Sequence, residues 1–303
     1  MNAAPSTPPL NVLLGNYPHT RPLKDGTVAV DGVECRYPES SPLPPAFARM
    51  VRELAYDICE MPTATYLQAR DAGIPLTLLP VVLVGSTHHR SLTRLPEGPE
   101  LDPGDLVGRR VGVRAYGQTT GLWVRGWLQE EYGVKSSDVT WVTTEDVHVA
   151  QYVNPPNVER STAERVADLL RSHDVSAAVL GPKAIGGQGA GLVPLVADAE
   201  GAGRAWTERH GTIPANHLLV VRDDVLRDRA DAVLAFYRAL ERTIADTAGE
   251  RDDSPAGRAV TAGWTPALTA CLEIAGRYAL EQHLVAEPVD VEAIEKKTAF
   301  LTR

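Results

Sequence analysis

The chain has 303 residues, with 30 Lys and Arg against 39 Asp and Glu, so its formal net charge at pH 7 is −9. Hydrophobic residues make up 44% and charged residues 23%, a globular composition that excludes a disordered or fibrous chain. The acidic balance argues against nucleic acid and against an anionic membrane surface as partners. At about 150 residues per domain, the length predicts two lobes or one large one.

The start of the chain and its cysteines predict a cytoplasmic protein. Residues 1–9 have no basic start, and the apolar stretch Leu10–Leu14 is too short for the core of an export signal. The longest apolar run, Leu78–Val84, is interrupted by a proline and is much shorter than a membrane span. The cysteines are odd in number and form no CxxC pair, so they are expected to be reduced thiols. They are Cys35, Cys59 and Cys271.

Apolar runs alternate with helical patterns in the first part of the chain. The predicted strands are Leu10–Gly15, the short pair Gly26–Val28 and Val33–Tyr37, then Ala55–Cys59, Leu76–Val84 and Ser91–Thr93. The predicted helices are Pro44–Leu54 and Thr63–Ala72. Strands separated by helices favour a parallel sheet with crossover connections, so the expected fold class is α/β.

A second unit is expected after the turn-rich stretch Pro96–Gly104. Its predicted elements are the strands Arg110–Val113, Val139–Val142, Ala177–Leu180 and Leu192–Leu195 and the helices Thr119–Tyr132 and Ala163–Ser172. The chain then returns through a strand, Asn216–Val221, to the helices Ala230–Ala248, Pro266–His283 and Val291–Thr298. This order predicts a discontinuous lobe I (residues 1–93 plus 211–303), an inserted lobe II (residues 94–210) and a small-ligand cleft between them.

Six segments hold ordered motifs that extend over nearly the full length. The clearest is Asp105–Thr143, DLVGRRVGVRAYGQTTGLWVRGWLQEEYGVKSSDVTWVT. The others are Tyr17–Val28 (YPHTRPLKDGTV), Tyr56–Arg70 (YDICEMPTATYLQAR), Pro80–Arg94 (PVVLVGSTHHRSLTR), Ile213–Asp224 (IPANHLLVVRDD) and Gly263–Pro266 (GWTP). In this order they resemble the 4,5-dihydroxyphthalate decarboxylase family. The resemblance implies a two-lobed type 2 periplasmic-binding-protein-like fold and a decarboxylase activity.

The chain departs from that family pattern in two parts of the presumed substrate pocket. The family usually has Ser-Arg-x-Phe-Arg-His before the strand into the second lobe, where residues 84–89 here read VGSTHH. One arginine is therefore lost and the second becomes His88. Where the family often has Asp-x-Thr after a tyrosine, this chain has Pro18-His19-Thr20. These changes concern the substrate more than the fold.

Two turns that open helices are candidate carboxylate sites, Glu60–Thr63 and Tyr116–Thr120. Free N–H groups and the positive end of a helix dipole attract anions there, whereas simple helix capping is the alternative role for Thr63 and Thr119. Arg114 and Arg125 are candidate anion clamps, with packing or a solvated face as the alternative for Arg125. The expected substrate-binding set is His19, Thr20, Met61, Thr63, His88, Arg114, Tyr116, Thr119, Thr120 and Asn216.

Imidazole is the side chain best matched to proton transfer near neutral pH. The family match implies that His89 and His217 are the catalytic acid and base, with Glu60 tuning or sharing the base role. The remaining histidines are expected to be structural or at the surface: His148, His173, His210 and His283. No metal or other cofactor is expected, although His19, one of the paired histidines, His217 and Glu60 leave a divalent metal as an alternative.

The predicted function is a cofactor-independent decarboxylase of a hydroxylated aromatic or related cyclic carboxylic acid, similar to 4,5-dihydroxyphthalate. Two alternatives are a non-catalytic cytosolic protein that binds small acids and a lyase of the same fold with a different acid as substrate. The expected partner is a small carboxylate, with no nucleic acid and no membrane. A homo-oligomer is left open, because the aromatic pairs Trp123/Trp127 and Phe236/Tyr237 suit either a core or a subunit contact.

Overall fold

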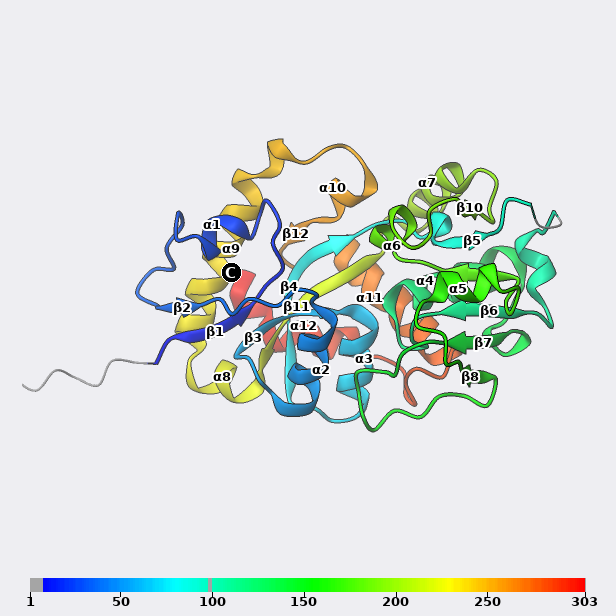
Figure 1. The fold of residues 1–303 in the computed structure, drawn as a ribbon. Coiled ribbons are helices and arrows are strands. Elements are labelled where there is room, and N and C mark those ends of the chain that lie inside the picture. The colour runs from blue at the N-terminus through cyan, green and yellow to red at the C-terminus, as the bar shows by residue number, and fades with distance from the viewer. Residues whose placement is uncertain (1–7, 98–99, 303) are drawn as a thin grey trace, which may run out of the picture.

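The computed structural model describes residues 8–97 and 100–302 as two six-stranded sheets with helices around them (Figure 1). The first sheet has the order β12-β4-β11-β3-β1-β2 and the second the order β10-β5-β9-β6-β7-β8. The strands of the first sheet are β1 Leu10–Leu13, β2 Cys35–Arg36, β3 Ile58–Pro62, β4 Leu76–Gly85, β11 Ala215–Arg222 and β12 Thr261–Ala262. Those of the second are β5 Leu92–Arg94, β6 Arg110–Val113, β7 Thr140–Thr143, β8 Val158–Arg160, β9 Ala177–Val179 and β10 Val193–Pro194.

The helices cover both sheets. They are α1 Arg21–Lys24, α2 Pro44–Glu53, α3 Thr63–Asp71, α4 Thr119–Tyr132, α5 Val166–Arg171, α6 Pro182–Gly186, α7 Ala199–His210, α8 Asp223–Asp228, α9 Ala230–Asp246, α10 Pro255–Ala259, α11 Pro266–Glu281 and α12 Val291–Thr298. Helix α11 packs against both α3 and α4, so it joins the helices of the first sheet to those of the second. None of the helices in the described part is long and apolar enough to cross a membrane.

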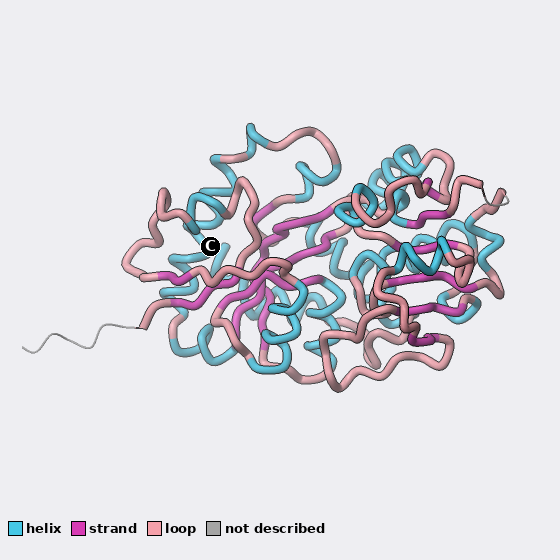
Figure 2. Tube along the Cα trace, in the orientation of Figure 1, coloured by secondary structure: helices cyan, strands magenta, loops and turns pink. Residues whose placement is uncertain are grey.

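The chain crosses between the sheets twice. It leaves the first sheet after β4, through a 3₁₀ turn at His89–Ser91, and returns after α7 into β11. Strand β11 lies antiparallel between β3 and β4, and Figure 2 shows the long strands β4 and β11 side by side. Strands β1 and β3 are parallel, so their carboxyl ends lie at the edge of the sheet where β11 begins. Ligand sites in open α/β sheets form outside the carboxyl ends of strands.

Most of the predicted elements are present, with two main differences. No strand forms at Gly26–Val28: this segment is a turn after α1, and the only strand beside it is β2, which pairs with β1. Strand β3 begins at Ile58 and continues to Pro62, several residues later than predicted. Helix α7 and strand β8 were not predicted. The proposed lobe boundaries stay a prediction, and the one at residues 93/94 falls within β5, which pairs in the second sheet.

Aromatic side chains fill the core of this chain. Trp123, Trp127, Phe236 and Tyr237 are all buried, so both aromatic pairs are core residues. Helices α4 and α11 approach each other closely at Gly126, where a Cβ atom would lie 1.9 Å from the ring of Tyr278. A larger residue at this position would push the two helices apart, because packed interiors leave no room for added atoms.

Candidate active site

The pairing of β3 with β11 brings Glu60 and His217 together. In this antiparallel pair Glu60 lies opposite Leu219, and His217 lies opposite Pro62. Because alternate residues of a strand point to the same face, His217 lies diagonally across from Glu60 on one face of the sheet. The His217 Nδ1 atom is 2.5 Å from Glu60 Oε1. The site thus begins with a carboxylate–imidazole pair at the edge where β11 starts.

Glu60 is completely buried and is held by three donors. Besides His217, the Tyr17 hydroxyl donates to Oε1 at 2.7 Å and the Gly15 amide donates to Oε2 at 2.7 Å. Burial raises the pKa of Glu60, but the hydrogen bond and charge of His217, together with the other two donors, outweigh burial and hold this pKa below 4.5. Glu60 is therefore ionised at neutral pH.

The ionised carboxylate fixes the orientation of the His217 ring. A carboxylate has no proton to give, so His217 Nδ1 must be the donor and Nε2 is left with a free lone pair that can accept a proton. The ring is 24% exposed, and the Phe47 ring meets it edge-on, with 5.3 Å between the two centroids. A Cβ atom at Gly15 would lie 2.6 Å from the Tyr17 ring, so only glycine lets Tyr17 reach Glu60.

His148 joins this cluster from the second sheet. Its Nδ1 atom is 2.9 Å from the Thr65 hydroxyl of α3, and its ring meets Phe47 edge-on. Arg52 at the end of α2 holds the same loop by donating to the carbonyl oxygens of Val147 and His148, each at 2.8 Å. These contacts hold the loop after β7 against helices α2 and α3. His148 was expected to be structural or at the surface, and no pattern in its loop indicates otherwise.

His19 packs against Tyr17. The two rings stack with centroids 5.3 Å apart, and the His19 side chain is buried without a hydrogen-bond partner for its ring nitrogens among the described residues. Burial, and then the positive charge of Arg251, lower the pKa of His19 to about 4. This predicted substrate-binding residue is therefore a neutral imidazole next to the Glu60 pair.

The two adjacent histidines point to different partners. His88 Nε2 lies 2.6 Å from Asn216 Oδ1, beside His217, and burial lowers the pKa of His88 to about 4. The His89 ring stacks on Trp127 of α4, and its Nε2 lies 3.1 Å from Glu131 Oε2. None of these contacts of His89 is with Glu60 or His217. The structure therefore brings His217, and not His89, to the carboxylate.

The starts of α3 and α4 face each other. The Ala64 amide of α3 donates to the Thr119 hydroxyl of α4 at 3.1 Å, and Thr63 donates to the Ala215 carbonyl at 2.8 Å. Neither Thr63 nor Thr119 occupies the cap position of its helix, which Pro62 and Gln118 hold without a side-chain hydrogen bond. Thr120 is buried in the first turn of α4.

The other predicted binding residues have partners within the chain. Arg114 pairs with Glu145 at 2.9 Å, and the Tyr116 hydroxyl contacts Ser136 and the carbonyl oxygen of Gln282, which follows α11. Arg125 is buried, with its guanidinium 4.1 Å from the centre of the Tyr116 ring. Thr20 donates to the Gly15 carbonyl and closes the turn after β1, whereas Met61 lies on the opposite face of β3 from Glu60 and is buried.

Two buried histidines and the half-buried His148 make the fold sensitive to acid. The pKa values of His19, His88 and His148 are lowered from 6.5 to about 4, chiefly by burial. Between these two pH values the unfolded chain binds more protons than the folded one, so the free energy of unfolding falls as pH drops from 6.5 towards 4. Urea midpoints at pH 7.5 and 5 measure this loss, and His19→Phe is expected to reduce it. An equal loss in this variant would contradict the role given to His19.

No three His, Cys, Asp or Glu side chains within residues 8–97 and 100–302 form a group that suits a metal ion. Of the residues in the alternative metal set, Glu60 and His217 are in contact with each other, whereas His88 and His89 contact other residues. The expectation of a reaction without metal or cofactor stays a prediction.

Comparison with known proteins gives the class first. The fold is similar to that of the desulfurization enzyme DSZB (TM-score 0.57, 17% identity, 94% of this chain and 95% of the other). It is also similar to the periplasmic aliphatic sulphonate binding protein SsuA from Escherichia coli (TM-score 0.59, 15% identity, 95% and 91%). At these identities the likeness shows the fold alone. The protein is a two-lobed α/β protein with a periplasmic-binding-protein-like fold, as expected.

Sequence comparison gives the family. The chain is 31% identical over 252 residues to a 4,5-dihydroxyphthalate decarboxylase of Comamonas testosteroni, which covers 77% of this chain and 74% of that protein. It is 40% identical over 135 residues to a protein of the same name from Pseudomonas putida, covering 44% and 52%. No family model matches the sequence. The chain belongs to the 4,5-dihydroxyphthalate decarboxylase family and is an enzyme, a carboxy-lyase.

Proposed function

We propose that this enzyme removes one carboxylate from a hydroxylated aromatic dicarboxylic acid of the 4,5-dihydroxyphthalate type. The observation that supports this most directly is the buried Glu60 carboxylate bound to His217, because it leaves one imidazole nitrogen ready for proton transfer. The names of the two relatives support the substrate class.

The chemistry needs a place for the electron pair of the carbon–carboxylate bond. A hydroxyl para to the leaving carboxylate provides it without a cofactor. Loss of the phenol proton and protonation of the ring carbon that bears the carboxylate give a dienone with a new C–H bond. The C–C bond then breaks, CO₂ leaves, and the electron pair restores the aromatic ring as a phenolate, which takes back the proton that the phenol lost. The protein has to move protons and hold the second carboxylate.

His217 is the proton-transfer residue in this proposal. Glu60 keeps Nδ1 protonated and stabilises the imidazolium that forms when Nε2 takes the phenol proton, so Glu60 acts as a positioning residue. His148, which contacts the same Phe47 ring, is the second imidazole of the site. This assignment replaces His89, whose contacts are with Trp127 and Glu131.

The purified protein is expected to release one equivalent of CO₂ from 4,5-dihydroxyphthalate and none from phthalate, because phthalate has no hydroxyl to accept the electron pair. Release of ¹³CO₂ from carboxyl-labelled acids measures this directly. We also expect the rate to be the same with and without a chelator. Saturable binding of 4,5-dihydroxyphthalate without CO₂ release would instead indicate the non-catalytic binder. Turnover of a non-phenolic acid only would contradict the electron-sink mechanism.

A further inference from the structure

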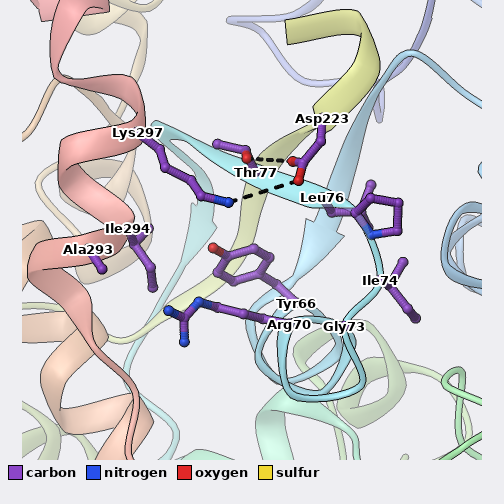
Figure 3. A pocket seen from close by; sticks show the side chains of 11 residues that line it. Tyr66, Arg70, Gly73, Ile74, Leu76, Thr77, Asp223, Ala293, Ile294 and Lys297 are labelled. Carbon is purple, nitrogen blue, oxygen red and sulfur yellow. Dashed lines mark hydrogen bonds and ion pairs between the residues drawn. The ribbon is translucent and has the colours of Figure 1, made fainter. Parts of the chain in front are cut away.

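A cavity of about 250 Å³ lies away from the Glu60–His217 pair (Figure 3). It forms where α3 turns into β4, with α12 packed alongside. His217 is near the start of β11, whereas Asp223, which lines this cavity, follows the end of that strand. The cavity and the proposed active site are therefore at opposite ends of the same strand.

Three hydrogen-bond donors line one side of this cavity. Arg70 lies in the last turn of α3, Tyr66 lies one turn earlier, and Lys297 lies in the last turn of α12. Figure 3 shows the Arg70 guanidinium directed toward α12, the Tyr66 hydroxyl between the two cations, and the Lys297 ammonium directed toward Asp223. Within the described residues, Arg70 makes no ion pair and no side-chain hydrogen bond. A half-buried guanidinium without a carboxylate is suited to an external anion, since its planar fork fits a carboxylate.

The charges around the cavity favour a single negative charge on the ligand. Two cations, Arg70 and Lys297, face one carboxylate, Asp223. Asp223 accepts a hydrogen bond from the Thr77 hydroxyl at 2.6 Å, and the Lys297 ammonium lies 3.9 Å from its other oxygen. Asp223 is thus fixed at the rim and would repel a second anionic group. Burial raises the pKa of the Tyr66 hydroxyl, which keeps it protonated as a donor.

The rest of the lining is apolar. Ile74, Leu76, Ala293 and Ile294 contribute aliphatic side chains. The volume is below the range of about 300–1,000 Å³ that is usual for drug-sized ligands, so the ligand has to be small. We propose that this cavity binds a small aromatic monocarboxylate, with Arg70 and Lys297 on the carboxylate and the ring against the two isoleucines.

This ligand class is also that of the product of the proposed reaction, because loss of one carboxylate from an aromatic diacid leaves a monoacid. The cavity would then sense the product. Sensing of the product rests on the proposed function, whereas binding of an aromatic monocarboxylate depends only on the residues of the cavity.

Titration with sodium benzoate of protein carrying ¹³C-labelled isoleucine methyl groups tests the site. The methyl signals of Ile74 and Ile294 are expected to shift and to saturate. Arg70→Gln is expected to weaken this binding about tenfold or more, because the charged guanidinium that would hydrogen-bond to the benzoate carboxylate is lost. Lys297→Gln is expected to weaken it as well. Lys296→Gln is the matched control, since Lys296 is on the same helix but pairs with Glu292 outside the cavity.

Three results would overturn the proposal. The first is that neither methyl group shifts in a saturable way. The second is that Arg70→Gln and Lys297→Gln bind benzoate as tightly as the unchanged protein does. The third is that inorganic phosphate, which has no apolar part, shifts the methyl signals as much as benzoate does. The same titration of His217→Asn is expected to give unchanged shifts at Ile74 and Ile294. This variant changes the proposed active site and not the cavity. Benzoate binding can therefore be judged even if the proposed reaction is not observed.

Discussion

His217→Asn is expected to lower kcat by about 10²–10⁴-fold, the usual contribution of one general acid or base. The asparagine amide nitrogen takes the place of Nδ1 and can still donate to Glu60, but the proton acceptor Nε2 is gone. The fold should be kept because the ring is 24% exposed. Steady-state rates of CO₂ release measure the effect.

His173→Asn is the matched control for this substitution. His173 is exposed, and its φ of 60° lies in the left-handed region that asparagine tolerates. The rate of CO₂ release by His173→Asn should equal that of the unchanged protein. If His217→Asn kept full activity with an unchanged pH profile, His217 would not be the proton-transfer residue. A loss of activity in His89→Asn with normal stability would restore the sequence-based assignment of His89.

Glu60→Leu is expected to cost about 3 kcal/mol of stability or more, because each buried donor left without its acceptor costs about 1–3 kcal/mol. The leucine leaves the Gly15 amide, the Tyr17 hydroxyl and His217 Nδ1 without their acceptor. Urea unfolding at pH 7.5 measures this cost. Activity should fall too, because nothing then fixes the His217 tautomer. Glu60→Gln, which keeps one acceptor oxygen, should lose less stability, and the exposed Glu53→Gln should lose almost none.

The sign of the pH effect tests the charge on Glu60. Its pKa in the folded chain lies below 4.5, so its stabilisation is fully present above that value and is lost as pH falls through the folded-state pKa. The stability gap between the unchanged protein and Glu60→Leu should therefore narrow at acid pH. A gap that stayed constant down to pH 4 would mean that folding does not lower the pKa of Glu60, contrary to its three donors.

Local patterns predicted the helices and strands that have strong periodicity or clear stop signals. The bounds of β6, α4 and α12 agree with the sequence prediction, and α4 ends where Gly133 adopts the left-handed conformation. Segments with weak patterns were predicted wrongly or were missed. The Gly26–Val28 segment has too few residues to distinguish a strand from a turn, and α7 contains two glycines and few apolar residues, so no helical pattern marked it.

The sequence by itself determined the α/β class and the family, and it indicated Glu60 and His217 as candidate site residues, because these depend on local order and on ordered motifs. Only the tertiary structure decided which imidazoles share a site with them. Residues 88 and 89 are neighbours in sequence, yet one ring turns to Asn216 and the other to Trp127 and Glu131. His148 and Tyr17 come to the site through contacts between segments far apart in the chain, and no local pattern records which distant segments will pack together.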